Sequence, residues 1–396
     1  MNDILLQNAP ADWTIERLGS LLSERREKVS DKDYRPLSVT KGGVVPQIEG
    51  VAKTDDGDNR KKVVSGDFVI NSRSDRKGSS GLSDVDGSVS LINIVLTPRH
   101  GHPRFLHYLL KSEAFQEEFY RWGHGIVADL WTTRYSELKN IKVALPDLDT
   151  QNTIAAFLDR ETARIDRLIE QKRRLLEVLD ARWSAILDRE ILGLVCDRRR
   201  AKTPRHPFVE SIPERWSLTP LKYLVDPRRP VMYGIVLPGP HVESGVLIVK
   251  GGDVKPNRLS PATLSKTAHE IEAGYVRSRL REGDLVIAIR GGIGDTEIVP
   301  AAIEGANLTQ DAARIAPRCG IFNEWLRYAL KTPAIFAVLA AGANGAAVRG
   351  INIFDLDRVP IPTPVFEEQQ AIAARLKEHE KQISRLKSAL ANRRAV

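Results

Sequence analysis

Few residues in this sequence have the types and spacing that enzyme chemistry requires. The glycine-rich piece Arg290 to Asp295 follows a strand-like run, yet it lacks G-x-G-x-x-G, and no Walker A sequence occurs. His100 and His102 flank Gly101 and precede Pro103, which favours a turn over a metal site. The patterns H-E-x-x-H, C-x-x-C and G-x-S-x-G are missing from the sequence. We therefore expect no catalytic residue and no metal site in this chain.

Length, charge and hydropathy narrow the class of protein. The 396 residues are enough for two or three domains. Lys and Arg number 59 against 51 Asp and Glu, and the net charge of +8 weakly favours a polyanionic partner. The longest apolar stretch, Ala334 to Ala341, is far shorter than the roughly 20 residues that span a bilayer. We expect no membrane association.

The cysteines and the N-terminus indicate the compartment. Cys196 and Cys319 are too few for a disulfide framework and lack metal-site spacing. Asp3 lies where a secretory signal peptide carries positive charge. These features predict a cytoplasmic, reduced protein.

An internal repeat decides the organisation of the chain. Groups of residues recur in the same order, with offsets that drift slowly from 203 to 220. The matched groups are Pro10, Trp13, Leu18 and Leu21 with Pro213, Trp216, Leu221 and Leu224; Lys41 to Gly43 with Lys250 to Gly252; Gly66, Asp67 and Arg73 with Gly283, Asp284 and Arg290; Tyr108 with Tyr328; and Ile154 and Leu158 with Ile372 and Leu376. Such a series indicates duplication of a unit of about 200 residues.

The front part of each copy, 1–145 and 208–362, predicts a globular domain. FVINS at 68–72 and LVIAIR at 285–290 are strand-like, and a Gly-Asp pair precedes each of them. Other stretches, 105–119 among them, have helical patterns. The mixture predicts an α/β (α+β) fold for both copies.

The back part of each copy predicts a long helix with a coiled-coil seam. Apolar residues recur at heptad spacing over 146–195 and 363–396, and a basic linker, 196–207, follows the first of these segments. The seam residues are Ile154, Leu158, Ile165, Leu168, Ile372, Leu376, Ile383, Leu386 and Leu390. The alternative is an ordinary amphipathic helix that packs on its own domain.

Connectivity predicts how the two helices pair. The first helix ends near the second domain and the second helix begins there, so the pair must run antiparallel. We expect residues 154–172 to pair with 372–390, a seam of roughly 28 Å. The result would be a dumbbell with approximate two-fold symmetry.

This duplicated plan resembles the specificity subunit of type I restriction-modification systems over essentially the whole chain. The specific marks are the P-x-x-W opening of each half, the Gly-Asp strand motif, and a junction from a proline through Glu-Gln into I-x-x-x-L. The second half keeps the junction as Pro362, Glu368, Gln369, Ile372 and Leu376. The first half departs from it with Thr150 in place of the glutamate, which we interpret as the loss of a helix-start contact.

The resemblance implies a non-catalytic reader of double-stranded DNA. Each globular domain would be a target recognition domain for one half of a split site. The helices would set the spacing and dock two methyltransferase subunits, and restriction or translocase subunits would join them. S-adenosylmethionine, ATP and magnesium would belong to those partners, and none would bind to this chain.

Basic residues in turns are the candidate DNA contacts. They are Lys41, Arg73, Arg76 and Lys77 in the first domain and Lys250, Arg290 and Arg349 in the second. Arginine and lysine bind phosphates or read guanine edges. The alternative is that they are solvated surface charges.

An apolar stripe beside the seam is the candidate docking surface. It contains Ile169, Leu176, Trp183 and Leu187, and the resemblance names a methyltransferase subunit as its occupant. The alternative is that the stripe packs against the neighbouring globular domain.

Rival interpretations of the whole chain stay open at this point. One is an enzyme with unrecognised motifs, and another is a coiled-coil scaffold whose end domains bind protein. A third is the specificity subunit of a related system that fuses methylation and cleavage in one partner.

Overall fold

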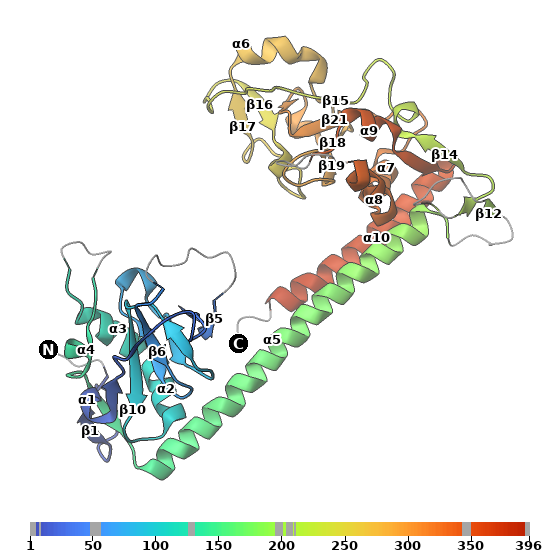
Figure 1. The fold of residues 1–396 in the computed structure, drawn as a ribbon. Helices are drawn as coiled ribbons and strands as arrows, with labels where there is room; N and C mark the ends of the chain where they lie inside the picture. The colour runs from blue at the N-terminus through green and yellow to red at the C-terminus, as the bar shows by residue number, and fades with distance from the viewer. Residues whose placement is uncertain are drawn as a thin grey trace. The chain divides into compact units, whose positions relative to one another are not determined.

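The computed structural model describes residues 5–7, 9–47, 57–125, 131–194, 201–202, 209, 211–342 and 350–392. The chain divides into two compact units, Met1–Ile169 and Glu170–Val396, and each is described by itself (Figure 1).

Unit 1 is built on a four-stranded antiparallel sheet in the order β2–β10–β7–β8. The strands are Leu22–Glu24, Asn93–Pro98, Phe68–Asn71 and Ser80–Leu82. Alternate residues of β7 face opposite sides, as a strand requires. Phe68 and Ile70 pack in the core with Phe105 of α2 (Pro103–Lys111) and Phe115 of α3 (Glu113–Arg121). Val69 packs on the other side, in a smaller cluster.

Shorter elements complete unit 1. Two further sheets, β3–β6–β9 and β4–β5, supply the smaller cluster, and β1 pairs with β11. Their bounds are Lys28–Val29, Arg60–Val63 and Gly87–Val89; Leu37–Thr40 and Gly43–Pro46; and Thr14–Arg17 and Lys142–Leu145. Among its described residues, unit 1 also contains α1 (Leu18–Leu21), the 3-10 turn η1 (Ser74–Arg76) and α4 (Tyr135–Leu138), and the long helix begins in it.

Unit 2 repeats this plan. Its central sheet has the order β15–β21–β18–β19, with strands Met232–Tyr233, Ala312–Ile315, Leu285–Ala288 and Thr296–Ile298. Helices α7 (Asn323–Lys331) and α8 (Pro333–Gly342) follow, as α2 and α3 do in unit 1. The other elements are β12 (Ala201–Lys202), β13 (Ile212–Pro213), β14 (Ser217–Pro220), η4 (Leu221–Tyr223), β16 (Val246–Val249), η5 (Gly251–Asp253), β17 (Ser265–Thr267), α6 (His269–Glu272), η6 (Ala273–Ser278), η7 (Ala301–Ile303), β20 (Asn307–Leu308), α9 (Ile353–Arg358) and β22 (Pro360–Thr363).

Strand register confirms the duplication and the mixed α/β fold. Strand β1 pairs antiparallel with β11 from Thr14 opposite Leu145, and β14 pairs with β22 from Ser217 opposite Thr363. In each unit the strand that follows the P-x-x-W motif is thus joined to the strand that precedes the long helix.

The Gly-Asp motif has the same structural role in both copies. Gly66 and Gly283 have positive φ angles of 93° and 81°, which glycine adopts without strain. Asp67 forms a bidentate ion pair with Arg25, at 2.7 and 3.1 Å. Asp284 pairs in the same way with Arg229, with both contacts at 2.6 Å. The motif therefore holds the turn that begins the central strand.

A buried glutamine fixes the start of each long helix. Gln151 accepts a hydrogen bond from the His102 N–H at 2.9 Å and donates to the Pro146 C=O at 2.9 Å. Gln369 accepts from the Phe322 N–H at 2.8 Å and donates to the Pro364 C=O at 3.0 Å. His102 and Phe322 are the N-caps of α2 and α7, so the same side chain ties the long helix to a domain helix in both copies.

The position before this glutamine differs between the copies. Glu368 accepts a hydrogen bond from the Trp216 indole N–H at 3.0 Å and pairs with Arg215. Thr150 takes its place in the first copy and bonds instead to the Asp147 carboxylate, twice at 2.8 Å. Threonine is too short to repeat the contact with tryptophan, so the first helix is capped locally.

The long helices are α5 (Leu148–Ile191) and α10 (Phe366–Asn392). Within unit 2 they run antiparallel, because Lys387 pairs with Asp180 and Arg375 pairs with Glu190 at 2.7 Å. Ile372, Leu376 and Ile383 are buried in this interface, and Leu390 packs at its edge. The predicted direction of the pair is therefore correct.

The predicted register of the pair is wrong. Residues 372–390 lie beside the last part of α5, from about Leu179 to Ile191, rather than beside 154–172. The reason is that Leu187 and Ile191 enter the same core as Ile372, so α10 begins where α5 ends.

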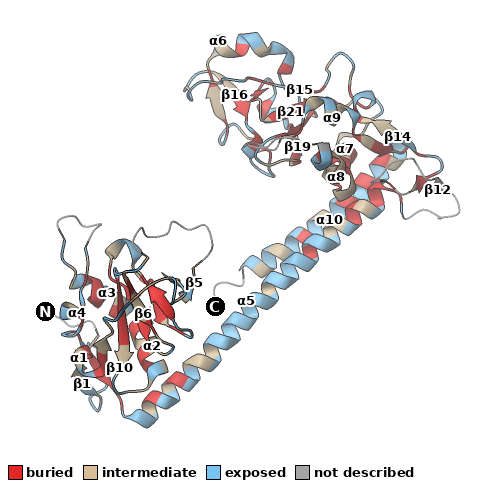
Figure 2. Cartoon of the chain, viewed as in Figure 1, coloured by how far each residue is buried: buried red, intermediate tan, exposed pale blue. Residues whose placement is uncertain are grey.

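The remaining predicted seam residues have different surroundings. Ile154 packs on the core of unit 1, and Leu158 is half-buried. Ile165, Leu168 and Leu386 are 55%, 51% and 50% exposed, and the middle of α5 is exposed over most of its surface (Figure 2).

The glutamine contacts give a stability prediction with a matched control. Gln369→Ala removes the side-chain partner of the half-buried Phe322 N–H and of the buried Pro364 C=O. An unsatisfied buried group costs about 1–3 kcal/mol. Gln370→Ala removes an exposed side chain from the next position of the same helix. Urea unfolding should show a lower midpoint for Gln369→Ala and little change for Gln370→Ala. Equal midpoints for the two variants would contradict the role of Gln369.

Candidate nucleic-acid interface

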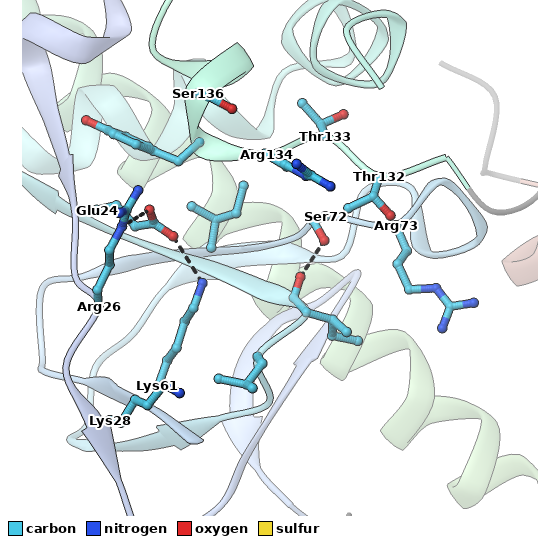
Figure 3. A pocket seen from close by; sticks show the side chains of 14 residues that line it. Glu24, Arg26, Lys28, Lys61, Ser72, Arg73, Thr132, Thr133, Arg134 and Ser136 are labelled. Carbon is cyan, nitrogen blue, oxygen red and sulfur yellow. Dashed lines mark hydrogen bonds and ion pairs between the residues drawn. The ribbon is translucent and has the colours of Figure 1, made fainter. Parts of the chain in front are cut away.

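Each unit has a surface hollow at the same place in the fold. The first hollow, about 670 Å³, is lined by Glu24, Arg26, Lys28, Lys61, Ser72, Arg73, Leu91, Ile92, Ile94 and Thr132 to Ser136 (Figure 3). The second hollow, about 550 Å³, is lined by Tyr233, Val236, Ile289, Arg290, Gln310 and Gly350 to Ile353. Both lie where the chain leaves the central strand of the sheet, β7 or β18.

The backbone of the two hollows matches in detail. The Thr133 N–H donates to the Ser72 C=O at 3.0 Å, and the Ile351 N–H donates to the Ile289 C=O at 2.9 Å. In both units the segment that enters α4 or α9 is thereby attached to the residue before Arg73 or Arg290. The two arginines therefore occupy equivalent positions, one in each hollow.

The first hollow is strongly cationic. Glu24 lies between Arg26 and Lys61, at 2.7 and 3.0 Å, and the bond to Glu24 raises the pKa of Arg26 (Figure 3). Among the described residues, no carboxylate lies within ion-pair distance of Lys28 or Arg134. These two charges are available to an anion.

The first hollow also exposes apolar groups beside its charges. Leu91 and Ile92 are 43% and 44% exposed at the turn before β10. Apolar side chains of this kind contact the methyl group of thymine in DNA grooves. Arginine and lysine supply phosphate or guanine contacts beside them.

The second hollow is polar rather than cationic. Arg290 is the one cation among its described lining residues, and Tyr233 is 48% exposed. Gln310 and Asn352 supply amide groups, the type that pairs with adenine edges. The Asn352 oxygen already accepts from the Phe354 N–H at 3.0 Å, which leaves its amide N–H₂ to a ligand.

The predicted DNA contacts of unit 1 differ in their surroundings. Arg73 contacts Asp75 at 3.2 Å; Arg76 lies 3.7 Å from the same carboxylate, and Lys77 pairs with Glu117. Lys41 is exposed in the turn between β4 and β5. Their contacts with DNA remain predictions.

The second-copy candidates divide into two groups. Lys250 is exposed, and its Nζ lies 3.3 Å from the Ser265 hydroxyl. The next residue, Gly251, is buried against the backbone of Arg290. Arg349 lies outside the described residues.

Sequence reasoning missed most of the lining of both hollows. Arg26 and Lys28 come from one segment of unit 1, and Lys61 and Arg134 come from two others. Tyr233, Gln310 and Asn352 are equally scattered in unit 2. The signal in the sequence that could have found these lining residues is the internal repeat. Continuing the alignment of the two copies places 132–135 opposite 350–353.

The predicted docking stripe on α5 is partly buried. Leu187 is 2% exposed in the core of unit 2, and the half-buried Trp183 ring packs edge-on against Tyr328 with centroids 6.1 Å apart. For these two residues the alternative interpretation, packing against the neighbouring domain, is the correct one. Ile169 and Leu176 are 44% and 37% exposed.

The described part of the chain holds no cluster of three metal-ligating side chains. Nor does any helix in it have the length and hydropathy to cross a bilayer.

Comparison with known families identifies the chain's relatives. The family described as "Type I restriction modification DNA specificity domain" matches residues 10–178 and 255–393. The chain belongs to this family. The match covers parts of both copies, in agreement with the duplicated fold.

Individual members of this specificity family resemble the chain to different extents. The EcoBI specificity subunit of Escherichia coli is 28% identical over 246 residues, which are 61% of this chain and 52% of that protein. A putative MjaX specificity subunit of Methanocaldococcus jannaschii is 23% identical over 93% of this chain and 87% of its own length. The chain thus matches about half the length of the E. coli relative.

Solved structures of the type I systems share the fold. A chain from a study of type I complex assembly and conformational transition has a TM-score of 0.64 and 19% identity, with 97% of this chain and 94% of that chain covered. The HsdS subunit of Thermoanaerobacter tengcongensis has a TM-score of 0.54 and 20% identity, with 97% and 93% covered. The likeness extends over both copies.

The glycine pair beside the Arg290 backbone gives a prediction. A Cβ on Gly251 would lie 2.3 Å from the Arg290 carbonyl oxygen, whereas a Cβ on Gly252 would meet nothing within 4 Å. Gly251→Ala should therefore lower the stability of unit 2 by about 1–3 kcal/mol through overpacking. Gly252→Ala is the control, and thermal unfolding compares them. Similar melting temperatures for the two variants would show that the backbone beside Arg290 is not tightly packed.

Proposed function

We propose that this chain is the non-catalytic, DNA-reading subunit of a type I restriction-modification complex, and that each hollow reads one half of a split site. Membership of the specificity family supports the DNA-reading role. The observation that carries the two-half interpretation is the pair of hollows with the same backbone and different side chains.

The chemistry of the hollows fits recognition of two different half-sites. Charged groups with exposed Leu91 and Ile92 in the first hollow suit phosphate, guanine and thymine contacts. Amide and phenol groups in the second hollow suit hydrogen bonds to other base edges. Because the fold is repeated and the lining is not, the two halves of the site need not share a sequence.

The long helix α5 is the proposed ruler and docking element. It runs without interruption from Leu148 to Ile191 and presents an exposed apolar face. That face contains Ile165, Leu168, Ile169, Leu175 and Leu176, which recur at three-, four- and seven-residue steps. An exposed stripe of this kind marks a protein interface.

A methyltransferase subunit is the proposed occupant of the stripe, with restriction or translocase subunits joining the complex. In this proposal S-adenosylmethionine, ATP and magnesium bind to the partners. The rival of a different class, an enzyme, would require the isolated chain to bind a methyl donor.

The reading proposal is tested by changing one hollow at a time. Arg73→Ala with Arg134→Ala alters the first hollow, and Arg290→Ala with Gln310→Ala alters the second. Methylated bases are then mapped in DNA from cells that carry each variant with its partner subunits. Each pair should relax or abolish recognition in one half of the site and leave the other half unchanged.

A control and a second readout keep this test decisive. Lys139→Ala with Lys142→Ala removes two exposed cations of unit 1 outside the hollow and should leave the methylated sequence unchanged. Where methylation is lost, the complex is tested on duplexes with one half-site scrambled. DNA binding by a variant complex should not change when the half-site read by its altered hollow is scrambled. A variant whose binding is weakened by scrambling either half-site would overturn the assignment.

The docking proposal has its own test. Ile169→Asp with Leu176→Asp should weaken assembly with the methyltransferase subunit by several kcal/mol, since burying one large apolar side chain contributes about 1.5–3 kcal/mol. Thr162→Asp with Gln171→Asp makes the same change of charge at exposed polar positions of α5. Size-exclusion chromatography compares the two. A folded Ile169/Leu176 variant that still assembles at low micromolar concentration would exclude this face.

A further inference from the structure

Unit 2 has another hollow, separate from the one proposed to read DNA. It has a volume of about 460 Å³, and we name it the arginine hollow. Six arginines and one glutamate account for all the charged residues in its lining: Arg228, Arg229, Arg277, Arg279, Arg281, Arg314 and Glu304. Such a concentration of guanidinium groups around one cavity is costly unless an anion shares it.

The arginine hollow lies on the opposite face of the central sheet from the second hollow. Arg314 pairs across the sheet with Met232 and Val286, and directly opposite residues point to the same side. Val286 belongs to the smaller core cluster of unit 2. Tyr233 lines the second hollow and pairs with Ala313, whose side chain faces the larger cluster. A ligand of the arginine hollow is therefore separate from a base in the second hollow.

The buried Arg314 is peculiar to the second copy. It is 2% exposed, and its equivalent in the first copy, by strand register, is the fully buried Val95. Its guanidinium donates to the carbonyls of Arg277 at 2.6 Å, Arg279 at 3.3 Å and Pro230 at 3.0 Å. Its Nε has no partner. The second copy thus has a buried charge at a position where the first copy forms the same strand with a valine.

Arg314 organises the cations around it. The three carbonyls it contacts belong to the two segments that carry Arg228 and Arg229 on one side and Arg277 to Arg281 on the other. Burial and the neighbouring charge of Arg229 lower the pKa of Arg314. Arg314 is therefore a positioning residue that brings the other arginines together.

The rim of the hollow retains unneutralised charge. Arg229 and Arg279 are paired with Asp284 and Glu272. Among the described residues, no carboxylate lies within ion-pair distance of the guanidiniums of Arg228, Arg277 or Arg281, and all three residues are exposed. Planar guanidinium groups bind phosphate oxygens through paired hydrogen bonds.

We propose that the arginine hollow is a phosphate-binding site, with Arg228, Arg277 and Arg281 as its direct ligands. The phosphate is either a phosphodiester of duplex DNA outside the base-reading surface or a phosphate carried by a small molecule. The site is additional to the proposed reading function, and its failure would leave the two reading hollows unaffected.

The test removes rim charges that are not part of the core. Arg277→Gln with Arg281→Gln is compared with Arg318→Gln and Lys255→Gln, two exposed cations of unit 2 outside the hollow. Both double variants lose two positive charges, so a nonspecific charge effect is the same in each. Because Arg277 and Arg281 are exposed, the variant is expected to fold, and its melting temperature without phosphate checks this.

Two probes distinguish the sources of the phosphate. Melting temperatures are measured in inorganic phosphate and in chloride at equal ionic strength. If the hollow binds a free phosphate, phosphate should raise the melting temperature of the wild type and the control by a few degrees but not that of the hollow variant. Binding of a DNA duplex is measured at several salt concentrations. If the hollow binds a DNA phosphate, the slope of the logarithm of the binding constant against the logarithm of the salt concentration should be smaller in magnitude by about two for the hollow variant than for the control.

Either response supports the proposal and names the source. The proposal is overturned if phosphate stabilises the hollow variant as much as the control and the two salt slopes agree. Arg314→Val, which installs the residue of the first copy, gives a second check. If this variant folds, it should lose the same response while its methylated sequence stays unchanged.

Discussion

A single buried side chain at the start of each long helix determines where that helix leaves its domain. Gln151 and Gln369 each join a proline carbonyl before the helix to the N-cap N–H of a domain helix. Because both partners are backbone groups, the contact places few demands on neighbouring side chains, and it has survived in both copies while the sequences around it diverged. The start of the long helix is thereby attached to a domain helix in each copy.

This arrangement leaves the surface free to change. The strands of the central sheet and their register are repeated, as are the ion pairs of Asp67 and Asp284. An equivalent backbone hydrogen bond, from Thr133 to Ser72 or from Ile351 to Ile289, holds the chain in each hollow. The side chains that line the hollows are nevertheless basic in one copy and polar in the other. A duplicated scaffold of this kind can acquire two specificities independently, because exposed lining residues such as Arg134 and Tyr233 lie outside the core clusters.

The sequence predicted the features that depend on local pattern and on the repeat. Strands at 68–72 and 285–290, the long helices and their antiparallel direction follow from residue spacing and connectivity. The register of α10 did not, because it depends on Leu187 and Ile191 being shared with the core of unit 2, a tertiary fact that heptad spacing does not contain. The hollows were missed for a related reason: Arg26, Lys61 and Arg134 converge from separate strands and turns, and no local motif marks them.

The alternation of side chains along a strand explains how one sheet serves two purposes in unit 2. Residues of β18 and β21 that face the helices build the larger core, and the second hollow opens at the end of that face. Residues of the opposite parity build the smaller core, and there Arg314 occupies the place of a valine. A buried charge costs stability unless it is well hydrogen-bonded. Hydrogen bonds to three carbonyl groups stabilise the buried guanidinium of Arg314. The same three bonds hold the arginine-bearing segments of the rim next to it. The two faces therefore present different side chains, because the period-two geometry of the strand lets each evolve without altering the other.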